Sequence, residues 1–132
     1  MLTHFYIDNF KSLVDFNLPL SRFNCLIGLN GAGKTTLLQA LDFASHVMSG
    51  QVQEWLAARS WSPADLTSQL GSNKSNIEIA IELTIDRVPL RWEATFNRTR
   101  LACTRELIQP VSYPLEQLLG DQINLSQPLF AL

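Results

Sequence analysis

The stretch GLNGAGKTT at residues 28–36 carries the residue types that bind phosphate. It satisfies the pattern G-x-x-x-x-G-K-[ST], in which successive backbone N–H groups surround a polyphosphate. Gly28, Gly31 and Gly33 allow an approach of backbone to phosphate that a side chain would block. The pattern therefore predicts a P-loop (Walker A motif) that binds ATP. The alternative is a glycine-rich turn in which the lysine has no such role.

The polar residues of this stretch have separate expected roles. Lys34 is expected to reach the β and γ phosphates, which makes it the candidate catalytic residue. The Thr35 hydroxyl is expected to ligate Mg²⁺, and Thr36 to contact the α phosphate. A helix that begins near Lys34 would add the positive end of its dipole to the same site.

The elements predicted on either side are those that a P-loop requires. Residues 23–27, FNCLI, form an apolar run typical of a strand buried on both faces of an α/β sheet. Apolar residues at helical spacing predict a helix over residues 34–48. These are Leu37, Leu41, Ala44 and Met48. Cys25, on the predicted strand, is interpreted as a small core residue.

Other segments predict the rest of an α/β domain. Residues 2–7 and 14–20 are predicted to be two strands at a sheet edge, and residues 51–59 a short helix. A further helix is expected to begin at Ser62, where Ser-Pro-Ala-Asp supplies a cap, and to end at Gly71.

After residue 76 the apolar residues alternate with polar ones. Three such runs, at 76–85, 88–96 and 100–108, are separated by short polar turns and predict an antiparallel meander. Pro89 cannot donate to a ladder, so it indicates an edge or a bulge in the middle strand. The predicted nucleotide-binding lobe covers residues 1–110, and residues 111–132 stay unassigned.

Bulk properties exclude several classes of protein. The 132 residues fit one domain, and a net charge of −2 gives no general attraction to nucleic acid or to a membrane. Cys25 and Cys103 lie far apart, which excludes a disulfide framework or a zinc knuckle as the organising principle. Neither a targeting signal nor a membrane-spanning segment is identified, so a cytoplasmic location is expected.

Three segments together resemble a known family. They are IDNFKSL, FNCLIGLNGAGKTTLLQALDF and the meander after residue 76. They resemble the N-terminal lobe of an ABC-type ATPase head of the AAA family, most closely the RecF, structural-maintenance-of-chromosomes and overcoming-lysogenization-defect groups. Transporter ATPases and GTPases usually have different amino-acid sequences at these motifs.

The resemblance covers roughly the first 110 residues. It implies that ATP is bound between two heads, and that a second lobe or a homodimer partner supplies the other side of the site. It implies Asn30 near the γ phosphate. It also implies that Lys11 and Ser12 approach the nucleotide, although a solvated turn is an equal alternative for that pair. The complete set of predicted nucleotide-binding residues is Gly28, Asn30, Gly31, Ala32, Gly33, Lys34, Thr35 and Thr36.

A complete head of this kind also needs motifs that this sequence does not contain. These are a signature loop of L-S-G-G-Q type, four apolar residues followed by Asp-Glu, and a late histidine. The run at residues 79–82, IAIE, is interpreted as a half-buried antiparallel strand rather than the acidic motif. Gln109 and Gln127, candidates for a metal-coupling glutamine, are interpreted as surface residues. Hydrolysis is therefore expected to need a further lobe or partner.

The competing functions are a small-molecule kinase or other phosphotransferase, and a non-catalytic remnant. The sequence NKSN at residues 73–76 lacks the final Asp that reads guanine, which disfavours GTP. Five arginines around the meander could contact DNA phosphates or a partner's carboxylates, or could form a solvated face. They are Arg87, Arg91, Arg98, Arg100 and Arg105.

Overall fold

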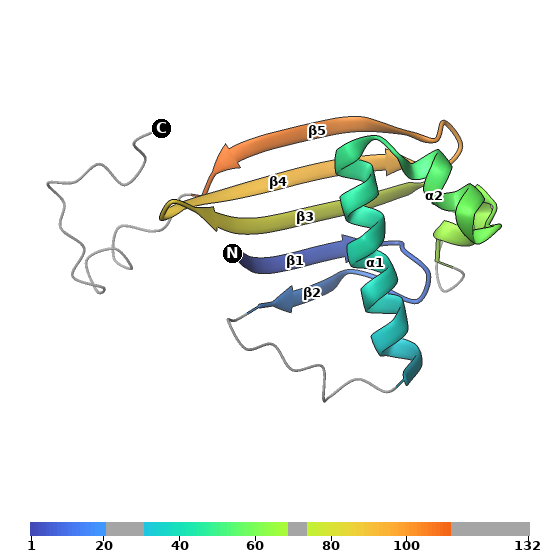
Figure 1. Cartoon of the computed structure of the whole chain (residues 1–132), viewed down its shortest axis with the longest axis horizontal. Coiled ribbons are helices and arrows are strands. Elements are labelled where there is room, and N and C mark those ends of the chain that lie inside the picture. The colour runs from blue at the N-terminus through green and yellow to red at the C-terminus, as the bar shows by residue number, and fades with distance from the viewer. Residues whose placement is uncertain (21–30, 69–73, 112–132) are drawn as a thin grey trace, which may run out of the picture.

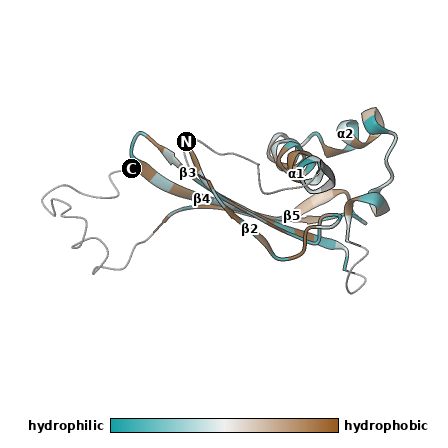
Figure 2. Ribbon diagram, turned by 90° about the horizontal axis from the view of Figure 1, so that it is seen from below, coloured by the Kyte–Doolittle hydropathy of each residue, from teal (hydrophilic) through white to brown (hydrophobic). Residues whose placement is uncertain are grey.

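The computed structural model describes residues 1–20, 31–68 and 74–111, and all structural statements below concern these residues. Five strands form one antiparallel sheet in the order β2-β1-β3-β4-β5. The helices lie together on one face of the sheet (Figures 1 and 2). The strands are β1 (Leu2–Asp8), β2 (Phe16–Pro19), β3 (Asn76–Ile85), β4 (Val88–Asn97) and β5 (Ala102–Pro110). The helices are α1 (Gly31–Ser49), α2 (Val52–Arg59) and the short 3₁₀ helix η2 (Pro63–Leu66). This part of the chain is a mixed α/β structure.

The meander forms around β3, where apolar residues recur at every second position, so that one face of this strand meets the helices. In β3, Ile77, Ile79 and Ile81 are buried on the helix side. A two-residue turn joins β3 to β4, and both of its residues, Asp86 and Arg87, have positive φ values of 51° and 68°. This left-handed backbone matches the twist of a hairpin, and it fixes the register of the pair.

The core lies between α1 and the sheet. The Phe43 ring stacks on Phe10 with centroids 5.1 Å apart, and meets Phe96 edge-on at 5.4 Å and Trp55 at 5.7 Å. These contacts join α1 to the end of β1, to β4 and to α2. Aromatic pairs in such geometry contribute about 0.5–1.5 kcal/mol each beyond burial of their area.

Most predicted elements in the described residues are confirmed. The two N-terminal strands lie at one side of the sheet, with β2 at its edge, although β2 is shorter than predicted. The helices predicted at 34–48 and 51–59 correspond to α1 and α2, and all three strands of the meander are present. The strand predicted at residues 23–27, with Cys25, and the tail at 112–132 lie outside the described residues.

Two expectations were wrong. The segment after Ser62 has the predicted capping box, but it forms only the 3₁₀ helix η2 and is extended by Thr67, not helical to Gly71. Hydrogen bonding explains the early end, because the Lys11 N–H donates to the Leu66 carbonyl at 2.9 Å and a bridge pairs Phe10 with Thr67.

The second correction concerns Pro89. Strand β4 lies between β3 and β5 instead of at an edge, and its irregularity falls between Thr95 and Phe96. Pro89 is the second residue of β4, next to the hairpin, where a missing donor disturbs little of the ladder.

Candidate functional site

Helix α1 begins at Gly31, inside the glycine-rich stretch, so the predicted phosphate-binding residues occupy its first turns. Lys34 and Thr35 are exposed, while Gly33 and Thr36 are half-buried. The first turn contains no acidic side chain that would neutralise the positive end of the helix dipole. Gly28 and Asn30 lie outside the described residues. The geometry thus leaves the charged and hydroxyl groups of the motif at an accessible helix N-terminus, where an anion is favoured.

The rest of α1 explains why this end stays accessible. Among the residues of α1 whose burial is described, Leu37, Ala40, Phe43, Ala44 and Val47 are buried. Packing therefore holds the middle and the C-terminal half of the helix against the sheet. Lys34 and Thr35 lie ahead of these buried residues, at the end of the helix where an anion is favoured.

Lys11 and Ser12 lie in the turn between β1 and β2 and differ from each other. The Lys11 ammonium nitrogen lies 3.7 Å from the centroid of the Trp61 ring, so this side chain is packed and not simply solvated. Partial burial lowers the pKa of Lys11 below its ordinary value, and nearby Asp65 opposes that shift. Ser12 is exposed, as the solvated alternative expected.

The Trp61 ring belongs to a cluster that ties α2 to α1. Trp55 Nε1 and Arg59 Nη2 both donate to Asp42 Oδ2, at 2.8 and 2.7 Å. The hydrogen bond from Trp55, more than the one from Arg59, lowers the pKa of Asp42, while partial burial opposes the shift. Trp61 meets Trp55 edge-on at 5.4 Å. Trp55 and Trp92 are buried and Trp61 is half-buried, so these tryptophans act as packing residues in the described fold.

Asn9 is a residue whose role the sequence did not reveal. It is buried, with 5% exposure, and its backbone is left-handed with φ of 66°. Its side-chain nitrogen donates to the carbonyl oxygens of Lys74 and Asn76 at 3.0 and 2.9 Å, and its oxygen accepts from the Ser68 N–H at 3.1 Å. Asn9 therefore joins the end of β1 to the start of β3 and to the segment after η2. The position of Asn9 beside a predicted turn is the single feature of the sequence that could have suggested this bridging role.

The five arginines do not form one basic surface. Arg91 donates to Glu82 Oε1 at 2.8 Å and to Glu93 Oε1 at 2.6 Å, and Arg105 pairs with Glu93 at 3.3 Å. Hydrogen bonding from Arg91 in particular lowers the pKa of Glu93, with partial burial opposing the shift. Glu82 lies outside the segment that holds the five arginines and comes beside Arg91 only because β3 pairs with β4.

The remaining arginines lie at opposite ends of β4. Arg87 lies before β4, whereas Arg98 and Arg100 follow it, and a ten-residue strand is about 30 Å long. The Arg98 side chain donates to Thr67 Oγ1 at 2.8 Å. The fold therefore does not gather all five arginines into a single DNA-binding patch.

The run IAIE at residues 79–82 lies within β3, which pairs antiparallel with β1 and β4. This confirms that the run, which ends in Glu82, is an antiparallel strand and not the acidic motif.

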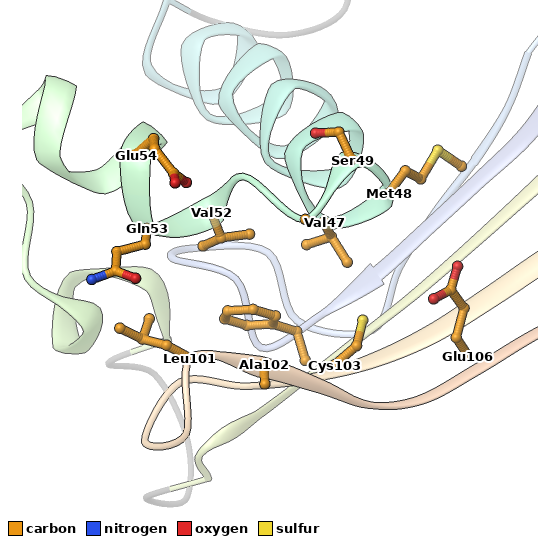
Figure 3. Close-up of a pocket in the computed structure, with 12 residues that line it drawn as sticks. Val47, Met48, Ser49, Val52, Gln53, Glu54, Leu101, Ala102, Cys103 and Glu106 are labelled. Atoms are coloured by element: carbon orange, nitrogen blue, oxygen red, sulfur yellow. The ribbon is translucent and has the colours of Figure 1, made fainter.

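A cavity of about 470 Å³ lies at the other end of α1 (Figure 3). Residues from the α1–α2 junction and the start of β5 line it, among them Val47, Glu54, Cys103 and Glu106. Burial raises the pKa of the Cys103 thiol. A helix of 19 residues is about 28 Å long, so this cavity is remote from Lys34.

The part of the chain that the structure describes holds neither a candidate metal centre nor a candidate membrane span. No group of three or more His, Cys, Asp and Glu side chains among them could hold a metal ion. None of the helices described is long and apolar enough to cross a membrane.

Comparison with known proteins identifies the family. Residues 1–89 match the family described as AAA ATPase domain. The chain belongs to this family. The expected resemblance to the N-terminal lobe of an ABC-type AAA ATPase is thereby confirmed, and membership implies a P-loop NTPase fold.

Individual relatives agree with this assignment. The chain is 36% identical over 109 residues to the OLD nuclease of Thermus scotoductus, covering 80% of this chain and 18% of that protein. It is 35% identical over 113 residues to the galactofuranose transporter ATP-binding protein YtfR of Escherichia coli, covering 78% of this chain and 22% of that one. It is 44% identical over 46 residues to the DNA replication and repair protein RecF of Actinobacillus pleuropneumoniae, covering 34% and 13%. The chain thus spans about a fifth or less of the length of these relatives.

Proposed function

We propose that this chain binds ATP with Mg²⁺ through residues 28–36, as the N-terminal part of an ATPase. The observation that carries the proposal is the start of α1 at Gly31, with Lys34 and Thr35 exposed at an N-terminus free of acidic side chains in its first turn. Membership in the AAA ATPase domain family supports it.

The residues present suit a magnesium nucleotide. The backbone N–H groups at the start of α1 would hold phosphate oxygens, and Lys34 would place its positive charge beside the β and γ phosphates. The Thr35 hydroxyl, exposed in the same turn, would contribute an oxygen ligand of the kind that Mg²⁺ prefers. When bound, Mg²⁺ would neutralise charge on the phosphates. Asn30, Gly31, Ala32, Gly33 and Thr36 complete the proposed site.

We further propose that hydrolysis needs polypeptide beyond this chain. The activating carboxylate would come from a second lobe or a homodimer partner, since the acidic motif is absent from the sequence given. Lys34 would stabilise charge on the γ phosphate during attack by water. A purified chain that hydrolyses ATP at the rate of a complete enzyme, about 1 per second or more, and loses this activity with Lys34→Ala, would contradict that dependence.

A place in DNA repair or in phage defence is part of this proposal. The name of one relative, DNA replication and repair protein RecF, supports DNA repair, and that of another, OLD nuclease, supports action on nucleic acid. Contact with DNA through Arg98 and Arg100 belongs to this proposal. It would show as binding that weakens with salt. The competing function of a small-molecule kinase gains no support from these relatives.

Replacement of Lys34 tests the proposed site. Lys34→Ala is expected to weaken ATP binding by about tenfold to a hundredfold or more, because a charge-assisted contact to a phosphate contributes about 1.5–3 kcal/mol. Isothermal titration calorimetry with Mg²⁺ and ATP measures the affinity. Lys74→Ala, which removes another exposed lysine, is the matched control and should bind as the wild type does. Equal affinity of the Lys34 and Lys74 variants would count against the site.

A further inference from the structure

Among the described residues, the helices cover the sheet over only part of its length. Figure 2 shows α1 and α2 over one end of the sheet, while the end with the β3–β4 hairpin extends beyond them. On this end a hollow of about 310 Å³ is lined mostly by apolar side chains, with Glu106 as the one charged residue of its lining. We call the apolar lining residues the open apolar face, and they are Met48, Leu83, Ile85, Leu90, Trp92 and Ile108.

Exposure of this face is costly for a protein in water. Met48, Ile85 and Ile108 are 46%, 50% and 65% exposed. They come from α1, β3 and β5, so the face is contiguous across three elements and not a single exposed residue. Contiguous apolar surface of this kind usually marks a place where another segment or molecule packs.

The described chain ends beside this face. The Val111 N–H donates to the Pro89 carbonyl at 3.0 Å, and Pro110 pairs with Leu90, which is itself part of the open apolar face. The residues that follow therefore start from its rim. The face spans β3, β4 and β5, two strand spacings or about 10 Å. Each following residue reaches up to about 3.3 Å, so fewer than ten residues can cross it.

The sequence that follows has a suitable composition. Between residues 112 and 132 the only charged residues are Glu116 and Asp121. Leu115, Leu118 and Leu119 have the spacing of one face of a helical turn, with Pro114 ahead of them and Gly120 directly after them. A segment of this composition is better accommodated against apolar surface than in water.

We propose that residues 112–132 pack on the open apolar face, with Leu115, Leu118 and Leu119 in contact with Met48, Ile85 and Ile108. The segment thereby completes the core at the end of the helix-facing side that α1 does not cover. This docking does not depend on nucleotide binding, so its failure would leave the proposed P-loop function untouched.

Engineered disulfides test the proposal in the full chain. Cys25→Ser and Cys103→Ser first remove the native thiols, since Cys103 lines the cavity beside Met48 and would compete. Met48→Cys is then combined with Leu119→Cys, because a disulfide requires Cα atoms within about 7 Å. The matched control is Leu38→Cys with Leu119→Cys, since Leu38 is 54% exposed on the same helix, about 15 Å away along its axis.

The Met48 pair is expected to form an intramolecular disulfide at least about tenfold faster than the Leu38 pair. Addition of Leu118→Asp should reduce its rate to that of the control, which separates docking from simple tethering. Equal rates in the two pairs, or bonds only between chains at a rate that rises with protein concentration, would overturn the proposal. If circular dichroism shows that the Met48 variant does not fold, Ile85→Cys against Val14→Cys, each with Leu119→Cys, gives the same comparison.

Discussion

At the scale of the residue, Asn9 joins three stretches of chain through its two side-chain polar atoms. Replacement by Ala would leave a buried N–H and two carbonyls without these partners, and would put a residue that tolerates the left-handed backbone less well than Asn at φ of 66°. Asn9→Ala is therefore expected to lower the free energy of unfolding by about 2–4 kcal/mol. Urea denaturation measures this. Asn17→Ala, which removes one exposed bond to His4, should cost less than about 1 kcal/mol.

Tyr6 makes stability depend on alkaline pH. Burial, with a hydrogen bond to Asp15 Oδ1 at 3.0 Å, raises the pKa of Tyr6 from about 10 to about 12. The protonated phenol is favoured in the folded state, so its contribution is complete below pH 10 and is lost as pH rises from about 10 to about 12. As pH rises over this range, the free energy of unfolding of the wild type should fall relative to that of Tyr6→Phe. A difference that does not change with pH would contradict this assignment.

Residue roles were predictable only where the chemistry lies within one short stretch. Lys34 and Thr35 stand in a motif whose spacing is itself the signal. Asn9 and Glu82 act on partners dozens of residues away or on another strand, such as Ser68 and Arg91. Their roles depend on strand pairing, which a linear pattern does not contain.

At the scale of the element, the β3–β4 turn has the shape of a two-residue hairpin turn, in which Asp86 is a preferred residue and Arg87 is not. Arg87 carries a β-carbon at φ of 68°. Arg87→Gly should relieve this strain and raise the free energy of unfolding by about 0.5–1 kcal/mol. The gain is smaller than the cost of about 1–2 kcal/mol for a left-handed residue with a β-carbon, because glycine has more conformational entropy in the unfolded chain. Arg100→Gly, in the other turn of the meander, lacks a positive φ among the described backbone angles and should be neutral or destabilising. The opposite order of the two variants in thermal denaturation would contradict the expectation.

Elements were predicted well where a single face is buried. The period of two in β3 and the helical spacing in α1 follow from contact with the same core, so the pattern and the structure have one cause. The segment after Ser62 had a cap and a terminating glycine but only one buried residue in η2, Leu66. Without an apolar stripe, pairing of the backbone with Lys11 and Phe10 decided its conformation.

At the scale of the whole molecule, the described residues form a two-layer arrangement that covers the sheet with helices at one end only. The other face of the sheet is polar, with Arg91 held between Glu82 and Glu93 and with Thr95 Oγ1 donating to Glu78 at 2.7 Å. An antiparallel sheet tolerates such a solvated face. The apolar end of the sheet beyond α1 is therefore the part of the fold on which we expect a further segment of this chain, or another molecule, to pack.

Binding of phosphate at the N-terminus of α1 can be observed most directly through the backbone amides of the helix. In a ¹⁵N-labelled sample of the 132-residue chain, addition of Mg²⁺ and ATP should shift the amide resonances of Gly31, Gly33 and Lys34 strongly. The amides of the turn at Arg98 and Arg100, beyond the far end of β4, should stay in place. Unchanged resonances at Gly31, Gly33 and Lys34, or larger shifts at the distant turn, would contradict the account.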